Sequence, residues 1–98
     1  DIPSPYMLMV APVKKPKDIP AVTHVDGTGR LQTVSKDSNE LYYCLINEFY
    51  KITGVPVLIN TSMNMMGEPI VNTPEQAHQM ILKTDMDFIV MGNYLVKK

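Results

Sequence analysis

Apolar residues recur three or four positions apart in the middle of the chain, which is the spacing of an amphipathic helix. The residues of this pattern are Leu41, Leu45, Phe49 and Ile52. Asp37, followed three positions later by Glu40, resembles a capping box, and Gly54 supplies a helix stop. The pattern therefore predicts a helix that begins near Asp37 and ends at Gly54.

A second helix is predicted from its start signals. Thr73 is a good N-cap residue, Pro74 fits the first helical position, and Gln76 fits the third. The helix is expected to end near Thr84. Its inner face is expected to consist of Ala77, Met80 and Ile81.

Strand-like runs fill the first third of the chain. The apolar run Tyr6–Val13 suits a buried or edge strand. Val22–Val25 and Arg30–Val34 are separated by the turn residues Asp26–Gly29, whose glycines permit positive φ. This arrangement predicts a hairpin between the second and third runs.

Further strands are predicted after the first helix. The β-branched run Val55–Ile59 leads directly into the polar cluster Asn60–Asn64, which we expect at the carboxyl end of that strand. Near the end of the chain, Phe88–Met91 and Tyr94–Val96 flank a reversal at Gly92-Asn93 and predict a final hairpin.

Interleaved strands and helices of this kind indicate an α/β or α+β domain, with one mixed β-sheet and two helices packed on it. A chain of 98 residues without an internal repeat forms a single domain with one core. Two helices cannot cover both faces of a five- or six-stranded sheet. Part of the sheet surface is therefore expected to contact something outside this sequence.

Composition narrows the function classes. The net charge is −1, and Lys14, Lys15 and Lys17 form the largest basic group, so nucleic-acid binding is disfavoured. No apolar run is long enough to cross a membrane, and the sequence opens without a secretory signal, which leads us to expect a cytoplasmic protein.

The lone Cys44 excludes an internal disulfide and a thiolate-rich zinc site, and we expect it to be a small buried residue of the first helix. His24 and His78 have no companions at metal-ligand spacing, so no metal site is expected.

Arg30 is the single arginine, and it follows a glycine-rich turn that could hold an anion with backbone N–H groups and a guanidinium. The alternative is a purely structural turn with a solvated arginine, and spacing alone favours that alternative.

The second candidate site is the polar cluster with Asn60, Ser62 and Asn64. If the backbone is extended there, Ser62 and Asn64 project to one face and can bind one ligand together. The alternative is an Asx or serine turn that satisfies only its own backbone. Residue types alone support both interpretations equally, and no catalytic residue is assigned.

Three blocks in order, His24–Val34, Thr53–Asn64 and Gly67–Val71, resemble the carboxyl-terminal region of the ATP-dependent O-carbamoyltransferases of the nodulation-protein and antibiotic-tailoring family. Ser4–Met7 and Phe88–Gly92 extend the resemblance to nearly the whole chain.

The resemblance implies that residues 1–98 are the C-terminal part of a YrdC-like domain in a longer enzyme, whose amino-terminal domain is of the sugar-kinase and actin-like ATPase type. In this family ATP, with Mg²⁺, activates carbamoyl phosphate to carbamoyl-adenylate, and the amino-terminal domain, which carries its own metal, transfers the carbamoyl group to an acceptor hydroxyl. Arg30 matches the arginine after the glycine-rich turn; Ser62 and Asn64 match a serine-x-asparagine element, with Asn60 just before it.

Two differences limit this resemblance. Met63 stands where the family commonly has phenylalanine, and the arginine- and glycine-rich stretch expected upstream is absent. We therefore expect a split site for ATP and carbamoyl phosphate that needs further residues from upstream, and 98 residues that alone bind ATP only weakly and are inactive. The amino-terminal ATPase-type domain of the same protein is an expected partner. The alternatives are a stand-alone nucleotide-binding module and a non-catalytic domain that either supports the catalytic domain structurally or dimerises it as a homodimer.

Overall fold

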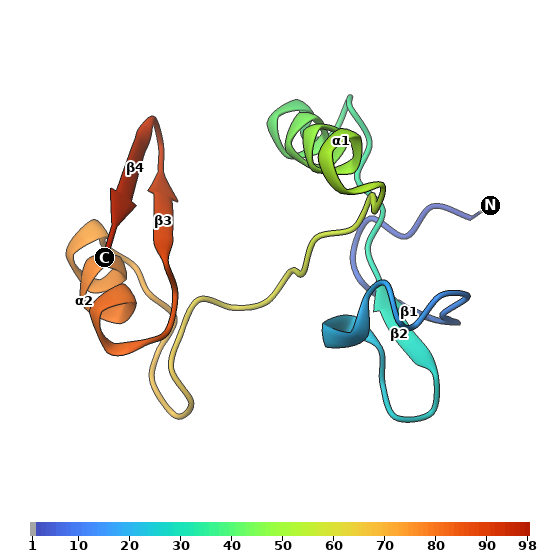
Figure 1. Cartoon of the computed structure of the whole chain (residues 1–98), viewed down its shortest axis with the longest axis horizontal. Helices are drawn as coiled ribbons and strands as arrows, with labels where there is room; N and C mark the ends of the chain where they lie inside the picture. Colours follow the sequence, from blue (N-terminus) through green and yellow to red (C-terminus); the bar gives the residue numbers. More distant parts are fainter. Residues whose placement is uncertain (1) are drawn as a thin grey trace. The chain divides into compact units, whose positions relative to one another are not determined.

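A computed structural model describes residues 2–98. The chain divides at Ile59 into two units, of which the second covers Asn60–Lys98 (Figure 1). The predicted α+β class with two helices is confirmed. The strands, however, form two separate two-stranded antiparallel sheets within the described residues instead of the single mixed sheet expected from the sequence.

The first sheet joins β1 (Met9–Pro12) to β2 (Thr28–Leu31), with Val10 opposite Arg30. The predicted hairpin between Val22–Val25 and Arg30–Val34 is therefore wrong, because β2 pairs with the earlier apolar run. Pro20 instead opens the short 3₁₀ helix η1 (Pro20–Val22), where its fixed φ and missing N–H are tolerated.

The N-terminal segment is hydrogen-bonded to the residues after β2. The Ser4 backbone N–H donates to the Thr33 hydroxyl at 2.8 Å, and the Thr33 N–H donates to the Ser4 carbonyl at 3.0 Å. Ser4 is buried, with its hydroxyl donating to the Leu31 carbonyl. Met7 adopts a left-handed φ of 57° in the turn that leads from this segment into β1.

Helix α1 (Glu40–Thr53) begins at the cap Asn39, whose side-chain oxygen accepts from the Tyr42 N–H at 3.1 Å. The predicted cap Asp37 is wrong, because it lies in a turn in which the Ser38 and Asn39 N–H groups donate to the Ser35 carbonyl. The predicted stop is confirmed: Gly54 takes a φ of 76° and its N–H donates to the Tyr50 carbonyl at 2.8 Å.

No residue of α1 is buried within the described chain. Leu41 and Ile52, two members of its apolar stripe, are each 83% exposed. Cys44 is exposed, so its expected burial is wrong. The reason is the same for all three residues: the described part of unit 1 supplies no layer for α1 to pack against.

The predicted strand Val55–Ile59 is also absent from the described structure, in which this segment is irregular and unpaired. Its β-branched composition favours a strand, but a strand requires a neighbouring backbone to complete its hydrogen bonds. The cluster Asn60–Asn64 consequently does not follow a strand.

The sequence-based predictions agree best with the structure in unit 2. Helix α2 (Pro74–Lys83) starts with the predicted capping box: the Thr73 hydroxyl accepts from the Gln76 N–H, and the Gln76 side chain accepts from the Thr73 N–H. The helix ends at the cap Thr84, as predicted. Ala77 and Ile81 are buried on its inner face, and Met80 is half-buried.

The predicted final hairpin is confirmed as β3 (Phe88–Met91) and β4 (Tyr94–Lys97), with Ile89 opposite Val96 and Gly92 at a positive φ of 59° in the turn. Helix α2 contacts β3 and lies beside the hairpin in Figure 1. Ile81, which is 0% exposed, is the centre of this small core.

Candidate functional site

The glycine-rich turn before Arg30 is filled by one of its own side chains. The Asp26 carboxylate accepts hydrogen bonds from the Thr28 N–H at 2.9 Å and the Thr28 hydroxyl at 2.7 Å. The Gly27 N–H donates to the His24 carbonyl at 2.9 Å. The backbone donors that were candidates for holding an anion are therefore committed to the turn itself, as the structural alternative requires.

The hydrogen bonds from Thr28, led by that of its hydroxyl, hold the pKa of Asp26 below its ordinary value of 3.8. The carboxylate is thus charged at neutral pH and would repel a phosphate placed at this turn. Arg30 is left as the candidate anion-binding group of this segment.

Arg30 lies in the middle of β2, where its side chain is exposed and its cross-strand neighbour is the apolar Val10. In residues 2–98, no carboxylate forms an ion pair with its guanidinium; the pairs found in that range are Lys36–Glu40 and Glu48–Lys51. A strand position fixes the direction of the side chain, and the absence of a described partner leaves its five donors available. The geometry suits two-pronged binding of a phosphate or carboxylate.

Asn64 organises the loop in which it lies. Its side-chain N–H₂ group donates to the Met65 and Glu68 carbonyls, each at 3.1 Å. These two acceptors fix the orientation of the amide, because only the nitrogen can donate. The carbonyl oxygen of this amide has no hydrogen-bond partner among the described residues and remains an acceptor for a ligand N–H or O–H.

The same loop is closed by backbone hydrogen bonds. The Val71 N–H donates to the Met63 carbonyl at 2.8 Å, and the Glu68 N–H donates to the Met65 carbonyl at 3.0 Å. Gly67 occupies the turn between Met65 and Glu68 with a φ of 80°, a position that glycine accepts without strain. The loop therefore has a defined shape with Asn64 at its centre.

Ser62 and Asn60 precede this loop and are exposed. The chain bends at Met63 and Asn64, so the extended backbone that would project Ser62 and Asn64 to one face is not present. The Ser62 hydroxyl has no hydrogen bond to any described residue and can donate to or accept from a ligand. Arg30 belongs to unit 1, whereas Asn60, Ser62 and Asn64 belong to unit 2.

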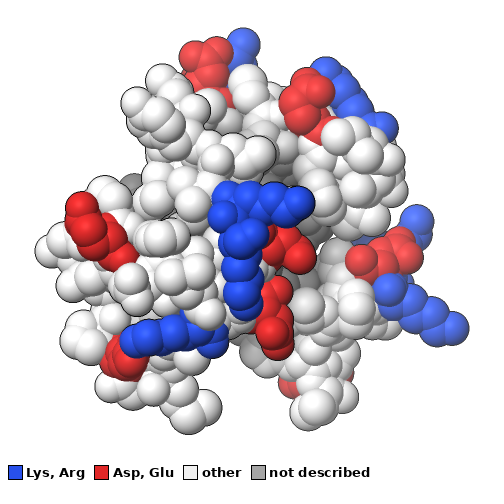
Figure 2. All heavy atoms as spheres, turned by 60° about the vertical axis from the view of Figure 1, so that its left-hand side comes forward, with Lys and Arg blue, Asp and Glu red and all other residues white. Residues whose placement is uncertain are grey.

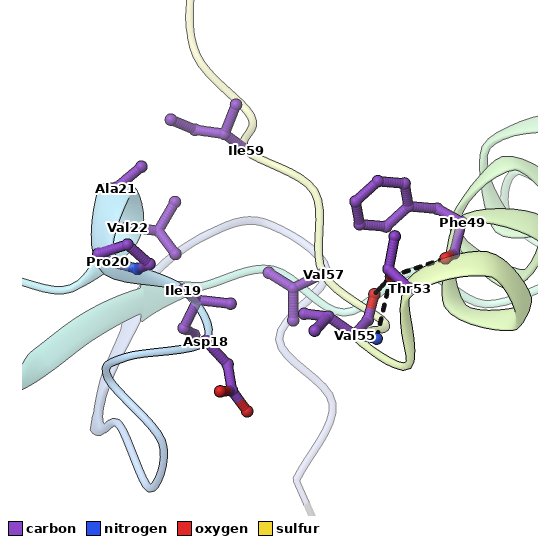
Figure 3. Close-up of a pocket in the computed structure, with 10 residues that line it drawn as sticks. All are labelled: Asp18, Ile19, Pro20, Ala21, Val22, Phe49, Thr53, Val55, Val57 and Ile59. Atoms are coloured by element: carbon purple, nitrogen blue, oxygen red, sulfur yellow. Dashed lines mark hydrogen bonds between the residues drawn. The ribbon is translucent and has the colours of Figure 1, made fainter.

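Unit 1 also contains an apolar groove that the sequence did not reveal as a pocket (Figure 3). Its volume is about 340 Å³, and η1, the end of α1 and the segment after Gly54 contribute its walls. The lining residues are Asp18, Ile19, Pro20, Ala21, Val22, Phe49, Thr53, Val55, Val57 and Ile59. The sequence shows Val55, Val57 and Ile59 at alternate positions, but it does not show that the residues of η1 and Phe49 lie next to them.

Acidic and basic side chains are interspersed on the face shown in Figure 2, and no large region of one sign gathers there. Within residues 2–98, no three His, Cys, Asp or Glu side chains lie close enough together to bind a metal ion. Across the same residues, no helix has the length and apolar character needed to cross a bilayer.

Comparison with known proteins identifies the family. The sequence matches the family described as Carbamoyltransferase C-terminus over residues 1–98. The chain belongs to this carbamoyltransferase family.

Three relatives illustrate the range of the family. Nodulation protein NolNO of Sinorhizobium fredii is 52% identical over 96 residues, which are 96% of this chain and 14% of the relative. Nodulation protein NolO of Bradyrhizobium diazoefficiens is 47% identical over 96% of this chain and 18% of its own length. An uncharacterized protein of Methanocaldococcus jannaschii is 46% identical over 97% of this chain and 19% of its own length.

The chain therefore spans between about a seventh and a fifth of the length of these relatives.

Proposed function

We propose that this chain contributes part of the site at which a carbamoyltransferase activates carbamoyl phosphate with ATP. In this reaction, water and carbamoyl phosphate give carbamate and phosphate, and carbamate then displaces pyrophosphate from ATP to form carbamoyl-adenylate. Both substrates carry phosphate groups. The exposed guanidinium of Arg30, which no described carboxylate neutralises, is the observation that supports binding them here.

The polar loop of unit 2, considered by itself, offers neutral groups for the same substrates. Ser62 offers a hydroxyl that no described residue engages, and Asn64 offers a carbonyl oxygen held in place by the two hydrogen bonds of its amide nitrogen. A fixed acceptor suits the amino group of a carbamoyl moiety or a ribose hydroxyl better than a phosphate oxygen. We assign Asn60 to the same site on the basis of its position before Ser62.

One arginine cannot balance the charges of ATP and carbamoyl phosphate. The proposal therefore requires further phosphate-binding residues from elsewhere in a longer polypeptide, including an amino-terminal ATPase-type domain that would carry out the transfer to the acceptor. Magnesium would arrive as part of the ATP substrate. Such a reaction draws on cytoplasmic metabolites, which supports a cytoplasmic location.

The test is the substitution Arg30→Ala in the full-length protein. Loss of a charged hydrogen bond costs about 1.5–3 kcal/mol, so we expect kcat/KM for pyrophosphate release to fall by about 10- to 150-fold. Arg30→Lys should restore little of this loss because an ammonium cannot reproduce the planar fork. Lys17→Ala, which removes another cation from unit 1, is the matched control and should have no effect.

Equal kinetics for Arg30→Ala and the Lys17→Ala control would contradict the proposed role of Arg30. A binding measurement with ATP and with carbamoyl phosphate, made separately, then distinguishes which substrate Arg30 contacts.

Ser62→Ala and Asn64→Ala test the loop separately. Ser62→Ala should lower the rate of carbamoyl-adenylate formation without changing the melting temperature, since its hydroxyl stabilises no described residue. Asn64→Ala should lower both, because it also removes two hydrogen bonds that hold the loop. A Ser62→Ala protein with normal activity would remove Ser62 from the site.

A further inference from the structure

The segment Val55–Ile59 is apolar on both of its sides. Val55, Val57 and Ile59 line the groove of unit 1 (Figure 3), whereas Leu58, between the last two, does not and is half-buried. This alternation is that of a β-strand whose two faces are both covered by protein. Within unit 1 the cover is incomplete, since Ile59 is 60% exposed.

The backbone of this segment is unpaired. Among residues 2–98, the N–H and C=O groups of Val57, Leu58 and Ile59 make no hydrogen bond. Val55 bonds only to the hydroxyl of Thr53, and Pro56 has no N–H. A β-branched, apolar segment with free backbone groups is the edge to which another strand adds.

The groove beside this edge suits the side chains of such a strand. Its walls are the apolar residues of η1 on one side and Phe49 of α1 on the other. Only two polar side chains line it, and one of these, the Thr53 hydroxyl, already donates to the Phe49 carbonyl at 2.8 Å. The groove therefore lacks the convergent polar groups that orient a small polar ligand.

We propose that Val55–Ile59 pairs with a β-strand from another part of the same polypeptide, whose apolar side chains fill this groove. The relatives support an occupant of this kind, because 96% of this chain matches only 14% of NolNO and 18% of NolO. Proteins of this family thus contain several times more sequence from which the strand can come. The proposal does not depend on the proposed reaction.

Pairing with a second copy of the segment fits less well. A two-fold pairing would align this five-residue segment, in which Pro56 cannot donate, with itself. It would also leave the exposed apolar stripe of α1 without cover.

The experiment is amide hydrogen exchange on the full-length protein. One added strand bonds alternate residues, and Pro56 cannot donate, so the edge used is that of Val55, Val57 and Ile59. We expect the amides of Val57 and Ile59 to exchange at least about 100-fold more slowly than in an unstructured chain, and equally slowly at low and high protein concentration. Exchange at the unstructured rate would overturn the proposal. Protection that appears only at high protein concentration would assign the edge to a second copy and would overturn it as well.

Two matched variants identify the occupant. Val57→Asp places a carboxylate in the groove and should raise exchange both at Ile59 and in one segment outside residues 1–98, which is the partner strand. Val25→Asp makes the same change at a fully exposed turn position and should leave exchange unchanged. If Val57→Asp prevents folding, the nearly isosteric Val57→Thr provides the same readout.

Equal effects of the Val57 and Val25 variants, or increased exchange confined to residues 1–98, would show that no strand from elsewhere in the polypeptide occupies the groove.

Discussion

Helices α1 and α2 are both well capped, yet only α2 has a partner. Helix α2 buries Ala77 and Ile81 on the side where it contacts β3. Helix α1 is longer, with 14 residues against 10, but none of its residues is buried within the described chain. Capping residues therefore specify that a helix forms, but they do not specify whether that helix packs into a core.

The difference indicates which unit has a small core of its own. In unit 2 the helix packs on one side of the hairpin, although Phe88, Val90, Tyr94 and Leu95 of the hairpin remain exposed. Unit 1 presents the apolar stripe of α1 and the open edge of Val55–Ile59, which are typical of surfaces that are buried in a larger structure. Three predictions test this contrast.

The largest expected effect comes from shortening one isoleucine in each helix. Ile81→Ala leaves a cavity in the core of unit 2 and should lower the free energy of unfolding of that unit by about 2–5 kcal/mol. Ile52→Ala removes a side chain that is 83% exposed and should change the stability of the 98-residue chain by about 0.5 kcal/mol or less. Urea unfolding followed by circular dichroism measures both.

The same pair should behave differently in the full-length protein. If α1 is covered there, Ile52→Ala becomes clearly destabilising. An unchanged, small effect of Ile52→Ala in the full-length protein would mean that α1 remains a surface helix.

An intermediate and equal effect is expected from the two caps. Asn39→Ala and Thr73→Ala each remove a side chain that accepts from a backbone N–H in the first helical turn, at a cost of about 1 kcal/mol. Amide exchange in the first turn of each helix is the readout. A much larger effect at Thr73 than at Asn39 would show that the two caps are not equivalent. Gln76→Ala would then test the reciprocal bond, in which the Gln76 side chain accepts from the Thr73 N–H and which Thr73→Ala leaves in place.

The smallest effect is expected at the exposed ion pair of α1. The hydrogen bond and charge of Glu48 raise the pKa of Lys51 above its ordinary value of 10.5. A raised lysine pKa favours the helix below that value, and the benefit disappears as the pH rises through the pKa of the folded form. Glu48→Gln should return the Lys51 pKa toward 10.5, as followed by NMR titration, without a detectable loss of helicity at pH 7. A marked loss would mean that surface charge stabilises α1 in place of burial.

Features encoded within a few residues were predictable. Thr73, Pro74 and Gln76 specify the start of α2 by local hydrogen bonds and backbone preference, and Gly54 specifies the end of α1 by its positive φ. The start of α1 was misplaced by two residues because Asp37 and Asn39 are equally good caps, and the Ser35–Ser38 turn selects the second.

Features that depend on distant partners were not predictable. The strand that contains Arg30 pairs with Met9–Pro12 and not with Val22–Val25, a choice that local composition does not encode. Cys44 and the segment Val55–Ile59 consist of residue types that are usually buried. Whether they are buried depends on other parts of the protein that pack over them, and local sequence does not specify those parts.

For the candidate site, the sequence singled out Arg30 and Asn64 but not their surroundings. Asp is a common turn residue, so Asp26 did not stand out in the sequence. Only the structure shows that its carboxylate accepts the Thr28 hydrogen bonds that a bound anion would otherwise accept. The role of Asn64 in its own loop depends on the Glu68 carbonyl, four residues away, being brought back by the turn at Gly67.

Gly29, the second glycine before Arg30, limits which side chains are possible at its position. A Cβ at Gly29 would lie 3.0 Å from the Val22 carbonyl oxygen and 3.2 Å from a methyl of Val13. Val22 also lines the groove of unit 1. An alanine at position 29 would therefore require Val22 to shift by a few tenths of an ångström, so the side chains permitted at position 29 are limited by a residue that also lines the groove.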